Sequence, residues 1–140
     1  MRRFTLLIAI VALAGSFQLG RAAERQPPRV YELRTYTTLP GRLPALHARF
    51  RDHTMRLFEK HGMRNEAYWV PTDSARRDNT LIYVLSHASR EAADASWRAF
   101  AGDSAWIRVR NASEADGPIL ARNPERTWMV ATDYSPPARP

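Results

Sequence analysis

The chain has 140 residues, 44% hydrophobic and 25% charged, which is the length and composition of one globular domain. It contains no cysteine, which excludes disulfides, thiolate metal sites, cysteine nucleophiles and a lipid anchor on cysteine. The net charge of +7 comes from 20 arginines and Lys60 against 14 acidic residues.

Residues 1–22 show the three-part pattern of a secretory signal peptide. A positive start at Arg2 and Arg3 precedes an apolar run over residues 4–14, and Gly20-Arg21-Ala22 offers the small residues that a signal peptidase recognises. The apolar run is short for a membrane span, so an uncleaved anchor is the less favoured alternative. The arginine pair also fits the twin-arginine route, but the general secretory route is favoured. We expect a periplasmic or secreted protein with no stable membrane anchor.

The basic charge does not predict nucleic-acid binding. Cleavage after Ala22 removes three arginines and no acid, so the net charge falls from +7 to +4. The remaining arginines are spread along the chain, often beside acids, with no basic run interleaved with aromatic residues.

The domain is expected over residues 30–137, after an exposed lead-in at residues 23–29. Val30–Thr37 is rich in β-branched and aromatic residues, which is typical of a strand. From Leu43, apolar residues recur at helical spacing as far as Gly62, where a helix is expected to end. Residues 63–70 and 80–87 predict two strands that form a hairpin. Residues 89–101 predict a helix capped by Ser89, residues 105–112 a short helical piece, and residues 126–132 a last strand.

This βαββαβ order predicts an α+β, ferredoxin-like fold with a four-stranded antiparallel sheet and both helices on one face. The third strand is apolar on both of its faces, because Leu81, Tyr83 and Leu85 alternate with Ile82 and Val84. A solvated face would not need such residues. We therefore expect a second copy of the sheet to cover it, which makes the protein a homodimer.

The sequence resembles the NIPSNAP family from about Val30 to Pro137. The residues that carry the resemblance are Tyr31-Glu32-Leu33-Arg34-Thr35-Tyr36, Pro40-Gly41, Phe50, His53, Leu57, Lys60-His61-Gly62, Tyr68-Trp69, Asn79, Leu81-Ile82-Tyr83, Asp103, Trp106 and Thr132-Asp133-Tyr134-Ser135-Pro136. The resemblance implies a dimeric α/β barrel, a superfamily that includes cofactor-independent monooxygenases, isomerases, haem enzymes and ligand-sensing domains. The chain departs from the family pattern at Leu85, where a tryptophan is frequent, and at Ala92-Ala93, where an arginine is favoured.

His53 is the first candidate for chemistry. Its spacing from Leu46 and Phe50 places it on the apolar stripe facing the sheet, as a general base, a ligand donor or, the favoured interpretation, a bonded core histidine. It lies about 12 Å along the helix axis from His61 and about 9 Å from His47, so neither pair shares an ion. We expect no metal site and no cofactor, although a lone histidine ligand to haem is left open.

Glu32, Arg34 and Tyr36 alternate onto one side of the first strand, and we expect that side to be the face covered by the second copy. Buried charges must be paired, so an interface ion pair is favoured. The alternative is that Arg34 anchors a ligand carboxylate. The other aromatic candidates for a ligand pocket between sheet and helices are Tyr68, Trp69, Tyr83 and Trp106, which are core residues by default.

The sequence therefore predicts an exported homodimer that binds a small apolar or aromatic ligand or a protein partner. The alternative is a cofactor-independent monooxygenase or isomerase. A closed cavity of a few hundred Å³ with His53 or a tyrosine inside would indicate the enzyme. Space filled by side chains, with an apolar patch outside, would indicate the binding protein.

Overall fold

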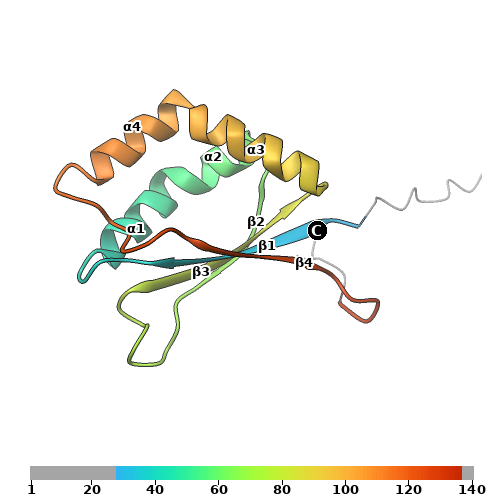
Figure 1. Cartoon of the computed structure of the whole chain (residues 1–140), viewed down its shortest axis with the longest axis horizontal. Coiled ribbons are helices and arrows are strands. Elements are labelled where there is room, and N and C mark those ends of the chain that lie inside the picture. The colour runs from blue at the N-terminus through green and yellow to red at the C-terminus, as the bar shows by residue number, and fades with distance from the viewer. Residues whose placement is uncertain (1–27, 137–140) are drawn as a thin grey trace, which may run out of the picture.

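A computed structural model describes residues 28–136, so the predicted signal peptide, most of the lead-in and Pro137 lie outside the described residues. The elements are β1 (Val30–Thr37), α1 (Leu43–Arg49), the π-helical segment η1 (Phe50–Thr54), α2 (Met55–Lys60), β2 (Arg64–Trp69), β3 (Thr80–His87), α3 (Arg90–Gly102), α4 (Ser104–Ser113) and β4 (Glu125–Val130). The four strands form one antiparallel sheet in the order β2-β3-β1-β4. All helices lie on one face of it (Figure 1). The predicted ferredoxin-like arrangement is confirmed.

The predicted helix cap, helix end and hairpin are all present in the structure. The Ser89 hydroxyl accepts a hydrogen bond of 3.1 Å from the Ala92 amide and so caps α3. Gly62 ends the first helix with a φ of +77°, a conformation that disfavours a side chain. The β2–β3 hairpin pairs antiparallel as expected.

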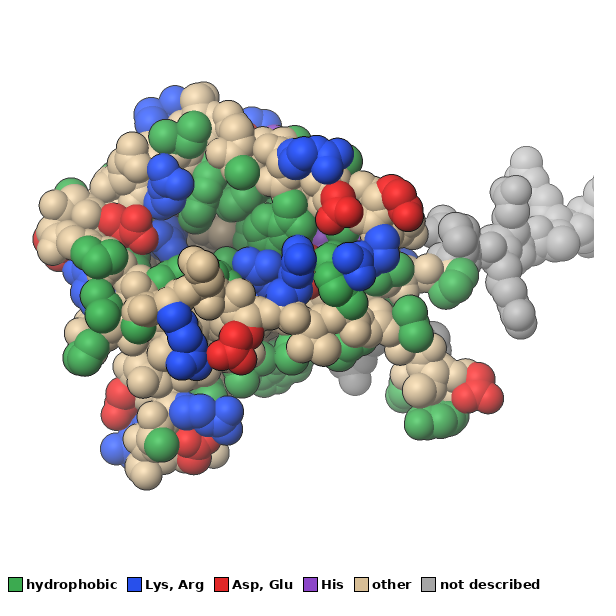
Figure 2. All heavy atoms as spheres, viewed as in Figure 1, with side chains coloured by type: hydrophobic (Ala, Val, Ile, Leu, Met, Phe, Trp, Pro, Cys, Tyr) green, Lys and Arg blue, Asp and Glu red, His purple; other side chains and the backbone are tan. Residues whose placement is uncertain are grey.

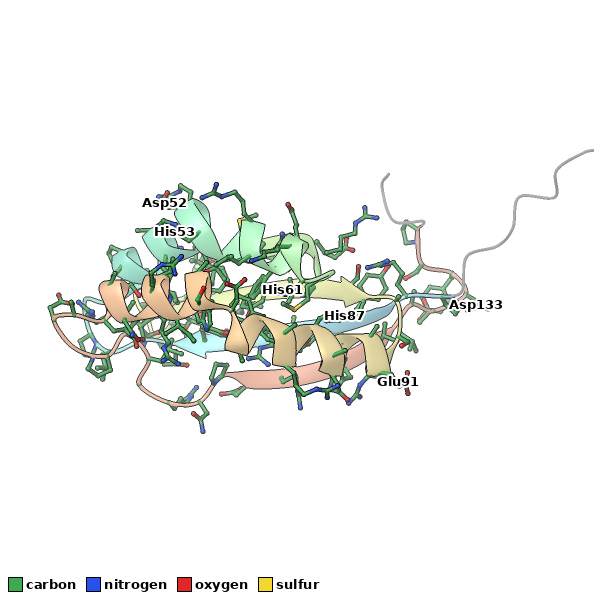
Figure 3. The ribbon with its side chains drawn as sticks, turned by 90° about the horizontal axis from the view of Figure 1, so that it is seen from above. Asp52, His53, His61, His87, Glu91 and Asp133 are labelled. Atoms are coloured by element: carbon green, nitrogen blue, oxygen red, sulfur yellow. The ribbon has the colours of Figure 1, made fainter. Side chains whose placement is uncertain are left out.

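The first helix is continuous over 43–60, but the segment Phe50–Thr54 is π-helical. This wider turn holds one residue more than an α-turn and shifts the stripe that faces the sheet. Leu46, Phe50 and Phe58 are buried, and Thr54, rather than His53, continues their row. The expectation that His53 faces the sheet was therefore wrong, because His53 is exposed on the outer side of the helix (Figure 3).

The side of β1 that faces the helices is also opposite to the side that we expected. Glu32, Arg34 and Tyr36 point toward the helices: Glu32 bonds to Trp97 of α3, and the Arg34 guanidinium lies over the same indole. The prediction that these residues occupy the face away from the helices was wrong. The outer face of β1 instead carries Tyr31 and Leu33.

The centre of the other sheet face is apolar. No described helix or strand covers this face (Figure 1). Strand pairing places Leu33 opposite Val84, and Tyr31 opposite Met129, on this face. Trp69, which pairs with Ile82 of β3, is 52% exposed. We call this surface the outer sheet face.

Candidate functional site

The most concentrated polar chemistry of the interior surrounds Glu32, which is fully buried on the helix-facing side of β1. Its carboxylate accepts hydrogen bonds from Arg34 Nη1 at 3.1 Å and from Trp97 Nε1 at 2.8 Å, and His87 Nε2 lies 2.9 Å away. We call these four residues the Glu32 cluster. Burial raises the pKa of Glu32, but the bonds to His87 and Trp97 and the charge of Arg34 outweigh it and lower the pKa overall. Glu32 is therefore held as a carboxylate.

Arg34 connects this cluster to the aromatic interior. Its guanidinium carbon lies 4.7 Å from the centroid of the Trp97 ring and 5.7 Å from that of Tyr36. Burial opposes its charge, but Tyr36, Tyr83 and Glu32 raise the pKa of Arg34 further above its ordinary value. Its Nε is buried without a hydrogen-bond partner among the described residues. Arg34 is thus a permanent buried cation with one unused donor.

A cavity of about 110 Å³ lies next to Tyr36, between β1, the first helix and the α3–α4 pair. We call it the central cavity. Its walls are mostly aromatic and its polar groups come from α1, η1 and α4; the lining residues include Tyr36, Phe50, Phe58, Phe100, Trp106, Arg49, Thr54, Arg110 and Glu114. Figure 2 shows the molecule hollowed between the helix layer and β4, with hydrophobic side chains inside and basic ones at the edge.

Arg49 is the second buried cation. It is 4% exposed, donates to Glu114 Oε1 at 3.1 Å, and lies 5.4 Å from the centroid of the Trp106 ring. Like that of Arg34, its Nε lacks a partner within residues 28–136. With Arg110, the central cavity is lined by two guanidinium groups and one carboxylate. Because Glu114 pairs with Arg49, the excess positive charge is that of Arg110, which is exposed at the cavity edge.

The aromatic candidates fall into three places. Tyr36 and Trp106 line the central cavity. Tyr83 is fully buried behind it, and its hydroxyl donates to the Tyr36 oxygen at 3.1 Å. Burial raises the pKa of Tyr83 well above its ordinary range. Tyr68 and Trp69 lie apart from the cavity, at the β2 edge of the sheet.

His53 joins none of these groups. It lies on the outer side of the helix layer, while His87 comes from the end of β3, on the sheet (Figure 3). It lines two shallow grooves between the first helix and α4. Within residues 28–136, no three His, Asp or Glu side chains are arranged to hold a metal ion, and no helix is long and apolar enough to cross a membrane.

Several polar site residues were not identified from the sequence, among them His87, Arg49, Glu114 and Arg110. His87 alternates with Leu81, Tyr83 and Leu85 on β3, so strand periodicity carried the signal for its inward placement. Arg49 lies three residues after Leu46, on the same helix face, so helix periodicity carried the signal for its inward placement. Nothing local marks Glu114 as the partner of Arg49.

The model of the NIPSNAP family matches residues 31–136. Among curated proteins, none matches the chain.

Solved structures of similar fold include an uncharacterised NIPSNAP-like domain protein from Burkholderia xenovorans, with 15% identity, a TM-score of 0.67, and 80% of this chain and 92% of that chain covered. A NIPSNAP family protein of unknown function from Agrobacterium tumefaciens has 18% identity and a TM-score of 0.65, with 78% and 93% covered. SnoaB, a cofactor-independent oxygenase from Streptomyces nogalater, has 13% identity and a TM-score of 0.51, with 79% and 100% covered. At these identities the likeness concerns the fold.

Proposed function

The chain belongs to the NIPSNAP family, and we propose that it is a binding protein which takes a small planar anion with an aromatic body into the central cavity. The observation that carries the proposal is the pairing of aromatic walls with an excess of one guanidinium group. Planar guanidinium groups suit carboxylates, and aromatic walls suit the face or edge of a ring.

The size of the space favours binding over catalysis. The central cavity, about 110 Å³, is far below the few hundred Å³ expected for the enzyme, and most of the space between sheet and helices is filled. It is of the order of the cavity of about 150 Å³ that takes up benzene in another protein. That cavity is larger and holds benzene alone, so a single ring inside, with its carboxylate at the exposed edge beside Arg110, is the largest ligand that the central cavity suits without rearrangement.

A titration with 4-fluorobenzoate, followed by ¹⁹F NMR, tests this proposal. The informative variant is Arg110→Gln, because Arg110 is exposed at the cavity edge and its loss should leave the fold intact. We expect binding about tenfold weaker, the value of one charge-assisted hydrogen bond of about 1.4 kcal/mol. Arg108→Gln is the matched control, since Arg108 lies on the same helix but does not line the cavity. Equal affinities of the two variants would contradict the proposal.

We also propose that the protein is a homodimer in which the outer sheet face is buried. The support is the uncovered apolar surface around Leu33 and Val84, which is costly to leave in water. Sedimentation of the mature chain at micromolar concentration should give a dimer, and Val84→Asp should give a folded monomer. A monomeric wild type would contradict this part of the proposal.

Export is proposed from residues 1–22 alone. Mass spectrometry of the protein recovered from a periplasmic fraction and from the medium should show a chain that starts at Ala23. A chain retaining residues 1–22 would contradict cleavage.

A cofactor-independent monooxygenase or isomerase is the second candidate, favoured by one observation. The Tyr83 hydroxyl donates to Tyr36, so the Tyr36 proton can be directed to a ligand oxygen in the central cavity. Oxygen uptake with hydroquinones, lost in Tyr36→Phe, would support the oxygenase. We expect no uptake.

A further inference from the structure

A second apolar depression lies at the β2 edge of the sheet, separate from the central cavity. We call it the edge trough. Its volume is about 450 Å³, and its apolar walls come from the first helix and from the end of β2, with Phe50, Met55, Tyr68, Trp69 and Val70 among the lining residues. Val70 is 45% exposed, so the trough is accessible from solvent.

Phe50 separates the edge trough from the central cavity. Its ring lies 5.8 Å from the Tyr36 centroid and 5.8 Å from that of Tyr68, with edge contacts on both sides. Tyr68 is also fixed: it stacks on Tyr83 at 5.2 Å and its hydroxyl donates to Asn65 Oδ1 at 2.5 Å. The wall of the trough is therefore built from residues held by the core.

The ionisable side chains of the first helix that line the edge trough are basic. His47 and Arg51 lie one turn apart on the same helix and both line it, whereas no acidic residue does. The pKa of His47 is lowered, first by burial and then by the positive charge of Arg51. The nearby acid Glu59 does not line the trough: its carboxylate accepts a hydrogen bond of 3.0 Å from Asn65, and its charge helps to raise the pKa of Tyr68. No described carboxylate forms an ion pair with Arg51.

From this juxtaposition of an exposed apolar trough and the unpaired cation Arg51, we propose that the edge trough binds an amphiphilic organic anion larger than one ring, its apolar body against Tyr68 and Met55 and its acid group at Arg51. The positive charge favours a ligand with an acid group. The volume of about 450 Å³, against about 110 Å³ in the central cavity, favours a ligand with a larger apolar body.

The test uses two fluorescent probes that differ in charge. The anion 8-anilinonaphthalene-1-sulfonate should bind the wild type, and neutral N-phenyl-1-naphthylamine should bind at least tenfold more weakly. In Arg51→Gln the preference for the anion should fall about tenfold. Arg56→Gln, which removes an exposed arginine from the same helix outside the trough, should keep it. Equal effects of the two variants would overturn the proposal.

The position of the probe is tested separately. Met55→Ala should weaken both probes, because Met55 lines the trough, whereas Leu33→Ala on the outer sheet face should weaken neither. The opposite pattern would place the probe on the outer sheet face and overturn the proposal. Arg110→Gln should leave the naphthalene probe unaffected, and Arg51→Gln should leave 4-fluorobenzoate unaffected, so failure at one site is distinguishable from failure at the other. Circular dichroism confirms that each variant is folded.

Discussion

Replacing Glu32 with glutamine should destabilise the protein by about 3 kcal/mol. Glutamine fits the space, but it cannot compensate Arg34, and its amide group places a donor opposite either Arg34 or Trp97. A buried donor without an acceptor costs about 1–3 kcal/mol, and breaking a buried ion pair costs about 3–5 kcal/mol. Because the Arg34 side chain is 13% exposed, the lower end of the second range applies.

Urea unfolding followed by circular dichroism measures this cost. With a slope of about 1.5 kcal/mol per molar urea, the midpoint should fall by about 2 M. The control Glu125→Gln removes a carboxylate paired with Arg122 at 2.9 Å, where both side chains are more than half exposed, and should cost under about 1 kcal/mol. A Glu32→Gln cost as small as that of the control would refute the buried-pair interpretation.

The same pair of proteins gives a pH prediction with a defined sign. The pKa of Glu32 is lower in the folded protein than its ordinary value of 4.5. Its contribution is therefore present above pH 4.5 and is lost as the pH falls through the folded-state pKa. The stability difference between wild type and Glu32→Gln should shrink in acid; a difference that grows would refute the assignment.

Three further changes test the local structure. Gly62→Ala should cost about 1 kcal/mol through its φ of +77° alone, since the nearest atom to an added Cβ, Ser96 Oγ, is 3.7 Å away; an unchanged Tm would contradict this. Ser89→Ala removes the α3 cap and should lower the Tm by about 5 °C, whereas no change would mean that the cap is dispensable. Asp103 accepts a hydrogen bond from Lys60 at 2.6 Å, and its pKa is lowered. Asp103→Asn should therefore be less stable than the wild type above pH 3.8, and this difference should disappear in stronger acid. A stability difference that does not change with pH would contradict the charge argument.

Local periodicity was enough to predict where the strands lie in the sequence, but not which side of a strand faces the helices. The predicted bounds of β1 and β3 match the structure, because alternation and β-branched residues are properties of the segment itself. The burial of Glu32 depends on His87 and Trp97, which are 55 and 65 residues away in the sequence. A glutamate and an arginine on a strand therefore suggested the wrong face.

The candidate site was predicted in part for the same reason. Trp106 lines the central cavity, as predicted for an aromatic pocket between sheet and helices. Tyr36, also a pocket candidate, lines it too, although it was expected on the opposite sheet face. His53 was placed by a regular 3.6-residue period, which the π-helical segment over 50–54 interrupts. The pairing of Arg49 with Glu114 joins α1 to the end of α4 and has no local signature.

The most direct measurement is a crystal structure of the protein grown with 4-fluorobenzoate. We expect its ring between Tyr36 and Trp106, and its carboxylate at the exposed edge beside Arg110. A cavity occupied only by water or by a shifted side chain, at a 4-fluorobenzoate concentration that saturates the ¹⁹F signal, would contradict ligand binding between the sheet and the helices.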